Sequence, residues 1–301
     1  MEASSATRIK PALVAQGVRQ LVADYIALTK PRVQSLLLLT TVTTMYVAGD
    51  PPLSLVAWTC LGGYLSAGGA GAVNHFWDRD IDARMGRTAS RPVPSGRVAP
   101  RAALSYGLAL AALSVVELTL TVNALAAALA FAGFLGYVVV YTIWLKRRTP
   151  QNIVIGGAAG AVPPRVGWAA VTGRLTPPAL YLFAIVFYWT PPHFWALSLL
   201  MKDEYAKVGV PMLPVVRGEA ETRRQITLYS MLLTAVTLLP AAYGFFGVIY
   251  AVAAGLLGGL FIAGAVRLSR RADRRSALRL YLFSLLYLAL LFLAMVADVR
   301  L

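Results

Sequence analysis

Residues 53–82 of the chain read LSLVAWTCLGGYLSAGGAGAVNHFWDRDID. The run from Leu53 to Val73 contains no charged residue and is long enough, as a helix, to cross the roughly 30 Å of hydrocarbon in a bilayer. Asn74, Asp78 and Asp82 follow at spacings of four, which places an amide and two carboxylates on one helix face. This stretch therefore predicts a membrane-spanning helix that ends in a polar centre at the edge of the bilayer.

The composition extends this prediction to the whole chain. Hydrophobic residues make up 58% of the 301 residues, charged residues only 14%, and the mean hydropathy is +0.66. A soluble globule of this size needs more polar residues to cover its surface. We predict an all-α integral membrane protein, a bundle around a central cavity, with nine transmembrane helices at residues 32–48, 53–73, 102–122, 124–145, 153–171, 179–201, 226–243, 245–266 and 280–297.

The basic residues predict how this bundle is oriented. The formal net charge is +15, and 25 of the 28 lysines and arginines lie in the N-terminal segment and in the loops after the second, fourth, sixth and eighth spans. The positive-inside rule then predicts a cytoplasmic N-terminus and an outside C-terminus. Because the usage is rich in alanine and arginine, we expect the cytoplasmic (inner) membrane of a bacterium. Charges that alternate by loop argue against nucleic acid as a partner.

The domain organisation follows from the same pattern. Residues 1–31 are predicted to form a cytoplasmic segment, part of which could lie on membrane lipid as an amphipathic interfacial helix. Residues 32–301 are expected to form a single nine-helix domain. Its long cytoplasmic loops, 74–101 and 201–225, mix acids, bases and aromatic residues and are the predicted catalytic loops.

Both loops carry acids beside lysines and arginines, a pattern that favours a substrate with an anionic head and an apolar tail, such as a prenyl diphosphate. Asn74, Asp78, Asp82 and Asp203 offer the hard oxygen ligands that Mg²⁺ prefers together with phosphate oxygens. Cations would hold the remaining oxygens and stabilise the leaving diphosphate, and the candidates are Arg87, Arg91, Lys146 and Lys202. The simpler alternative is a solvated helix end whose acids pair with Arg79 and Arg84.

Several motifs carry a family resemblance. They are Asn74-x3-Asp78-x3-Asp82, Arg87-Thr-x-x-Arg91-Pro92, the run TPQNIVIGG at 149–157, the run YWTPPHFWAL at 188–197, Lys202-Asp203 and GVPMLP at 209–214. With these motifs the chain resembles the nine-helix intramembrane prenyltransferases of the UbiA type, and within them the branch that farnesylates haem B. The resemblance extends over nearly all the chain after residue 25.

The resemblance implies farnesyl diphosphate as donor, haem B as acceptor, Mg²⁺ as cofactor and haem O as product. It further implies a role in terminal-oxidase assembly, with haem A synthase or other assembly proteins as partners. The functional positions it carries over are Asn74, Asp78, Asp82, Arg87, Arg91, His193, Lys202 and Asp203. His75 departs from the quinone-precursor enzymes, which have a second acid there, and the later loop has His193 and Asp203 instead of a fuller Asp pair.

Alternatives remain at single residues. His193 is either an axial ligand of haem iron or a histidine that hydrogen-bonds across helices near a break at Pro191-Pro192. His75 is expected to support the metal site from behind. Glu117 and Arg165 lie inside predicted spans and are predicted to contact each other, with a haem propionate as the other candidate partner of Arg165.

Alternatives remain for packing and for function too. The pairs Gly156/Gly160 and Gly255/Gly259 are expected to permit close helix packing.

Prenylation of a quinone-ring precursor is the competing enzyme function. A cation-coupled secondary transporter and a haem-binding scaffold are the competing classes of protein.

Overall fold

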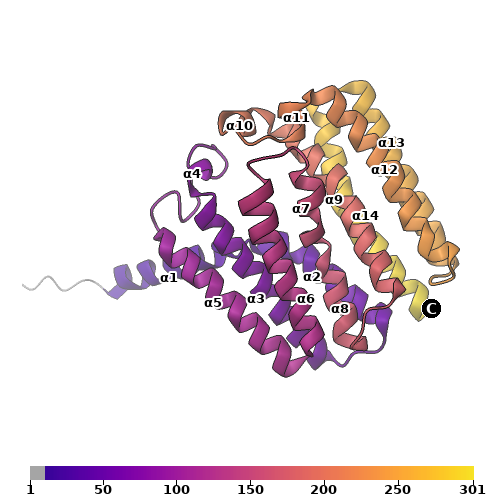
Figure 1. Ribbon diagram of the computed structural model, residues 1–301, viewed down its shortest axis with the longest axis horizontal. Coiled ribbons are helices and arrows are strands. Elements are labelled where there is room, and N and C mark those ends of the chain that lie inside the picture. Colours follow the sequence, from indigo (N-terminus) through magenta and orange to yellow (C-terminus); the bar gives the residue numbers. More distant parts are fainter. Residues whose placement is uncertain (1–10) are drawn as a thin grey trace, which may run out of the picture.

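The computed structural model describes residues 11–301, and within that range the ordered elements are all helices (Figure 1). In chain order they are α1 (Pro11–Leu28), α2 (Pro31–Ala48), α3 (Leu53–Trp77), α4 (Arg79–Asp82), α5 (Pro100–Thr121), α6 (Ala124–Leu135), the π-helix η1 (Gly136–Leu145), α7 (Asn152–Gly160), α8 (Val162–Thr172), α9 (Pro177–Leu200), α10 (Lys202–Lys207), α11 (Leu213–Val216), α12 (Gly218–Ala242), α13 (Val248–Arg271) and α14 (Arg274–Arg300). The predicted all-α class is confirmed.

Each predicted span falls on helix, although the boundaries differ. Among residues 11–301, five helical segments are long and apolar enough to cross a membrane: α5, α6 with η1, α12, α13 and α14. Crossing by the other four ranges, and the orientation of the termini, stay predictions. The loop predicted at 201–225 ends earlier, because α12 already begins at Gly218 and carries a charged first turn beyond its apolar part.

Proline placement separates two of the spans. The range 153–171 is divided into α7 and α8 at Ala161, since Pro163 and Pro164 cannot donate the backbone hydrogen bonds that would continue one helix. By contrast, α9 runs unbroken through Pro191 and Pro192, so the break predicted there is wrong. Helices of membrane proteins tolerate internal proline when neighbouring helices support the backbone.

The helices form a bundle whose last helix closes it. α14 packs against α9 and α13 and also against α2, so the end of the chain returns to its beginning. Figure 1 shows α4, α10, α11 and the turn from α13 to α14 at one end of the bundle, with the C-terminus at the other. The long polar loops therefore meet at one end, as their alternation along the chain predicts.

The outer surface of the bundle is apolar. Large hydrophobic side chains such as Leu120, Val248 and Leu256 are 80%, 77% and 66% exposed, whereas Tyr250, Phe261 and Tyr287 are fully buried between helices. Exposed apolar surface of this extent needs a lipid solvent. Together with the five apolar helices it describes an integral membrane protein.

Helix α1 lies beside this bundle. Arg97 Nε lies 3.0 Å from Asp24 Oδ2, and the rings of Tyr25 and Tyr106 meet edge to face, which fixes the C-terminal half of α1. Val18 and Val22 are about half exposed, so part of the helix has an apolar side that no described residue covers. Residues 1–10 of the predicted cytoplasmic segment lie outside the described residues.

The glycine prediction is only partly right. A Cβ at Gly156 would lie 2.4 Å from the Tyr141 ring, so close packing there is confirmed. Gly160, Gly255 and Gly259 have no such neighbour, because these positions do not face another helix.

Candidate active site

The predicted polar centre forms where α3 ends. Asp78 N donates to Asn74 O at 2.9 Å and Asp82 N to Asp78 O at 2.8 Å, so the helical hydrogen-bond pattern continues from α3 into α4. Asn74 Nδ2 donates to Asp78 Oδ2 at 2.7 Å, as the shared face requires. All three side chains are buried. Asn74, Asp78 and Asp82 are called the acidic centre below.

Three cations contact the acidic centre, and two of them, Lys30 and Lys146, come from distant parts of the chain. Lys146, which follows η1, pairs with Asp78 Oδ2, and Arg91 Nη1 lies 2.7 Å from Asp82 Oδ2. Lys30 Nζ donates to Asn74 Oδ1 at 2.5 Å and to the Tyr137 hydroxyl at 3.3 Å. Two nearly buried carboxylates thus have cationic partners, which offset the cost of removing them from water.

Lys30 is a residue that the sequence did not single out. It lies between α1 and α2 with a left-handed backbone (φ 55°), and Pro31 starts the next helix. Burial, followed by the nearby Arg91 guanidinium, lowers the pKa of Lys30 from 10.5 to about 8. Its only sequence signal is a position next to the first span, which many interfacial lysines share.

Arg147 is a second residue missed from the sequence. Its guanidinium donates to both oxygens of Asp80, at 2.6 and 2.8 Å, and reaches Asp78 Oδ1 at 3.5 Å. This hydrogen bonding lowers the pKa of Asp80. Arg79, one of the partners expected in the simpler alternative, instead donates to the Phe76 carbonyl. The acids are paired, but with cations from other segments.

The second polar loop packs on the first. Glu204 Oε2 accepts from Gly86 N at 2.7 Å, and apolar side chains of the two loops form one buried cluster that includes Ile81, Met85 and Val210. Burial raises the pKa of the Tyr205 hydroxyl, and the neighbouring Arg87 and Arg91 oppose that rise. Arg87 therefore belongs to the same charged region as Arg91.

The two predicted residues of the second loop are less closely integrated. Lys202 Nζ pairs with Glu219 Oε1 at 3.0 Å. The Asp203 side chain is exposed and has no hydrogen bond or ion pair with another described residue. Within residues 11–301 no three His, Cys, Asp or Glu side chains cluster as a metal site. The ligand set that joins Asp203 to the acidic centre stays a prediction.

The acidic centre nevertheless fits Mg²⁺ by its chemistry. It offers amide and carboxylate oxygens only, as a hard cation requires, and the surrounding cations suit a phosphate that completes the coordination. Both ring nitrogens of buried His75 lack a partner among the described residues, so polar capacity remains unused beside the centre. The support predicted from His75 is not formed by a direct hydrogen bond.

His193 lies elsewhere, on α9, and its side chain contacts α14. Its Nδ1 is 2.6 Å from Ser284 Oγ, and its ring stacks between Trp189 and Tyr281. Ser284 Oγ donates its only hydrogen to the Tyr281 carbonyl at 2.6 Å, so His193 Nδ1 must be the donor in this contact. The cross-helix hydrogen bond is thus present, and Nε2 keeps a free lone pair for a metal.

The predicted contact between Glu117 and Arg165 is wrong. Glu117 Oε1 accepts from Thr121 Oγ1 at 2.9 Å, and the Arg165 guanidinium lies 4.1 Å from the centroid of the Phe183 ring. Equal depth in the membrane does not make two helices neighbours, and α5 and α8 do not pack against each other.

Fold and site together define a helical integral membrane protein with a buried carboxylate centre, ringed by cations, at one end of its bundle. The profile of the UbiA prenyltransferase family matches residues 37–294, and the chain belongs to this family.

Solved structures share the fold. A digeranylgeranylglyceryl phosphate synthase superposes with a TM-score of 0.76 at 19% identity, over 93% of this chain and 99% of the other. A UbiA homologue from Archaeoglobus fulgidus bound to DMAPP and Mg²⁺ gives a TM-score of 0.63 at 17% identity, over 91% and 99%.

Curated relatives are much closer in sequence. Proteins named protoheme IX farnesyltransferase are 56% identical in Roseiflexus sp. strain RS-1 and 57% in Chloroflexus aurantiacus, over 94% and 93% of this chain but 53% and 48% of theirs. The chain thus spans about half the length of these relatives. One from Symbiobacterium thermophilum is 54% identical over 93% of this chain and 95% of its own length.

Proposed function

We propose that this protein transfers the farnesyl group of farnesyl diphosphate to a vinyl group of haem B, with addition of water, to give haem O and diphosphate. The observation that carries the proposal is the buried acidic centre, with Lys30, Lys146 and Arg91 in contact with it. The name shared by relatives at 51–57% identity supports the choice of donor and acceptor.

The residues of the site suit the cleavage of an allylic diphosphate. Asn74, Asp78 and Asp82 would hold Mg²⁺, which supplies charge neutralisation for the diphosphate when bound. Lys30, Lys146, Arg87, Arg91 and, from the second loop, Lys202 would bind the other phosphate oxygens. As the bond between farnesyl C1 and oxygen breaks, both electrons leave with the diphosphate, and these fixed cations stabilise the charge it gains.

The acceptor, haem B, then takes up the farnesyl group and water. The farnesyl C1 forms a carbon–carbon bond with the terminal vinyl carbon of haem B, water adds to the other vinyl carbon, and one proton is released. His193 Nε2 is our candidate ligand for the haem iron, because Ser284 and the flanking aromatic rings hold the imidazole in one orientation.

We further propose that residues 32–301 act as one catalytic domain with nine spans in a bacterial inner membrane. The acidic centre and the second loop, including Asp203, would face the cytoplasm, and haem O would pass to haem A synthase or an oxidase. The placement of the acids at the end of the bundle favours an enzyme over a transporter, since transporters couple cations near the midplane.

The test is a defined reaction. Purified protein is incubated with haem B, farnesyl diphosphate and Mg²⁺, and the pigments are identified by mass. We expect a product that is heavier than haem B by one farnesyl group and one hydroxyl group. Prenylation of an added quinone-ring precursor with unchanged haem would instead select the competing function, and unchanged donor and acceptor would reject both.

A further inference from the structure

The turn from α13 to α14 carries a charge cluster that the proposed reaction does not use. Six arginines lie within a short stretch of chain, and all six are exposed: Arg267, Arg270, Arg271, Arg274, Arg275 and Arg279. Asp273 is the one acid among them, and it caps α14 by accepting from Ser276 N at 2.6 Å. The cluster is therefore strongly positive.

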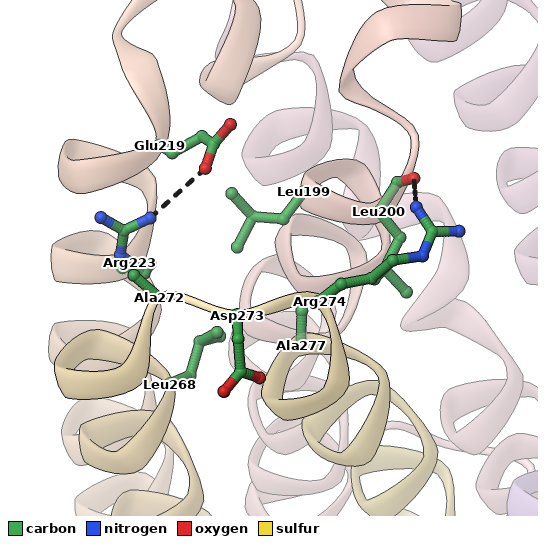
Figure 2. A pocket seen from close by; sticks show the side chains of 9 residues that line it. All are labelled: Leu199, Leu200, Glu219, Arg223, Leu268, Ala272, Asp273, Arg274 and Ala277. Carbon is green, nitrogen blue, oxygen red and sulfur yellow. Dashed lines mark hydrogen bonds and ion pairs between the residues drawn. The ribbon is translucent and has the colours of Figure 1, made fainter.

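The hollow on the inner side of this turn is already occupied by protein contacts. Figure 2 shows Arg223 directed toward Glu219, at 3.5 Å, and Arg274 bonded to the Leu200 carbonyl, at 3.1 Å. Both guanidinium groups have partners there, and Glu219 brings negative charge. This hollow is a poor binding place for an anion.

The outer side of α13 is different. A surface hollow of about 390 Å³ is lined by Ala263, Val266, Arg267, Arg270 and Arg271. Within the described residues, none of these three arginines forms an ion pair or a side-chain hydrogen bond. Positive charge at the C-terminal end of a helix is favourable by itself, which accounts for the arginines. It does not account for the apolar residues Ala263 and Val266 that line the same hollow.

From the hollow toward the N-terminal end of α13, exposed apolar side chains continue along the same side of the helix. Leu256, Leu260, Ala263, Arg267 and Arg270 follow one another at spacings of four and three, the periodicity of one helix face. Leu256 and Leu260 are 66% and 59% exposed, so no described residue covers them. Arg271 follows Arg267 by four residues and lines the same hollow, so this α13 stripe is a leucine track that ends in three guanidinium groups without a partner among the described residues.

We propose that the α13 stripe binds one anionic phospholipid, with the phosphodiester on Arg267, Arg270 and Arg271 and an acyl chain along Leu260 and Leu256. Bidentate guanidinium groups match phosphate oxygens, and an apolar track of this direction suits a lipid tail. A soluble anion would use the arginines without the track. The site does not depend on the identity of the reaction.

Native mass spectrometry of the full-length protein tests the site, with phosphatidylglycerol and phosphatidylcholine of identical acyl chains. The triple variant Arg267→Gln, Arg270→Gln, Arg271→Gln is compared with the matched variant Arg101→Gln, Arg217→Gln, Arg224→Gln, which removes three exposed arginines elsewhere. We expect the first to lose at least tenfold in phosphatidylglycerol affinity, since each basic residue near a phospholipid surface is worth about fivefold. The matched variant and phosphatidylcholine binding should not change.

Equal losses in the two variants would show a general effect of charge and overturn the proposal, as would no loss in either. A photoreactive phosphatidylglycerol on the unaltered protein gives an independent answer if the first triple variant fails to fold. We expect labelling within residues 256–271, and labelling confined to other helices would also overturn the site. Competition by inorganic phosphate alone at equal concentration would reject a lipid in favour of a free anion.

Discussion

The acidic centre after α3 and the loop after α9 differ in how fully the protein alone completes them. In the acidic centre every side chain is buried and bonded, and its cations come from three separate segments. In the loop after α9, Asp203 is exposed without a partner, and Lys202 pairs with Glu219 on α12. The comparison teaches that folding completes the contacts of the first region, whereas in the second it leaves the Asp203 carboxylate exposed and without a partner among the described residues.

The largest effect should come from Asp78→Asn. This change removes a buried charge that Lys146 and Asn74 contact. Under the proposed function it should also weaken the binding of the metal diphosphate. We expect kcat to fall about 10³-fold, the upper range for the loss of one electrostatic contact to a transition state. Asp80→Asn is the matched control, because Asp80 is 54% exposed and pairs only with Arg147. An equal loss in both variants would contradict the special place of Asp78.

Lys30→Met should have the next largest effect. The difference in kcat/KM between this variant and the wild type should depend on pH. Charged Lys30 can bind a phosphate and neutral Lys30 cannot, so kcat/KM of the wild type should fall as the pH rises through about 8. We expect Lys30→Met to lower kcat/KM about 10²-fold at pH 7 and to lack this step.

The free energy of unfolding should change with pH in the direction opposite to kcat/KM, because of the same lysine. Because its pKa is lowered on folding, the unfolded chain binds the proton more tightly than the native state between pH 8 and 10.5. The free energy of unfolding should therefore rise with pH in that window for the wild type and stay flatter for Lys30→Met. If the free energy of unfolding changed with pH equally in the two proteins, the lowered pKa of Lys30 would be contradicted.

Asp203→Asn should separate activity from stability. Since its side chain has no partner among the described residues, the free energy of unfolding without substrate should change by less than about 0.5 kcal/mol. We expect KM for farnesyl diphosphate to rise about tenfold if Asp203 meets the substrate as the resemblance implies. A large loss of stability would instead place Asp203 in the folded framework, as Asp78 is.

The smallest effect is expected at the contact between the loops. Glu204→Gln keeps an oxygen that can accept from Gly86 N, so activity should stay within about twofold of the wild type. Glu204→Ala removes that acceptor, and we expect activity to fall about fivefold through looser positioning of Arg87. Identical steady-state kinetics for the two variants would show that this contact does not align the loops.

What the sequence could predict was set by the range of the interactions. The shared face of Asn74, Asp78 and Asp82 follows from helix geometry within nine residues, and the structure confirms it. Lys30 was not predictable in the same way, because it lies 44 residues before Asn74 and the packing of α1 and α2 against α3 brings them together. Local rules cannot specify such a pair.

The errors have the same origin. Equal depth in the membrane suggested a contact between Glu117 and Arg165, but depth does not say which helices are neighbours. Glu117 instead accepts a hydrogen bond from Thr121, and Arg165 lies over the Phe183 ring. Pro163-Pro164 and Pro191-Pro192 are alike in sequence, yet only the first pair interrupts a helix. Support from neighbouring helices decides that outcome, and it is a property of the fold.

Electron paramagnetic resonance of Mn²⁺, used in place of Mg²⁺ with a non-reactive farnesyl diphosphate analogue, tests the central claim most directly. The wild type should bind Mn²⁺ only when the analogue is present, and phosphorus should appear coupled to the metal. The variant Asp78→Asn, Asp82→Asn should lose that bound metal while it remains folded. Unchanged Mn²⁺ occupancy and phosphorus coupling in this variant would contradict the assignment of the acidic centre as the place where the diphosphate is held.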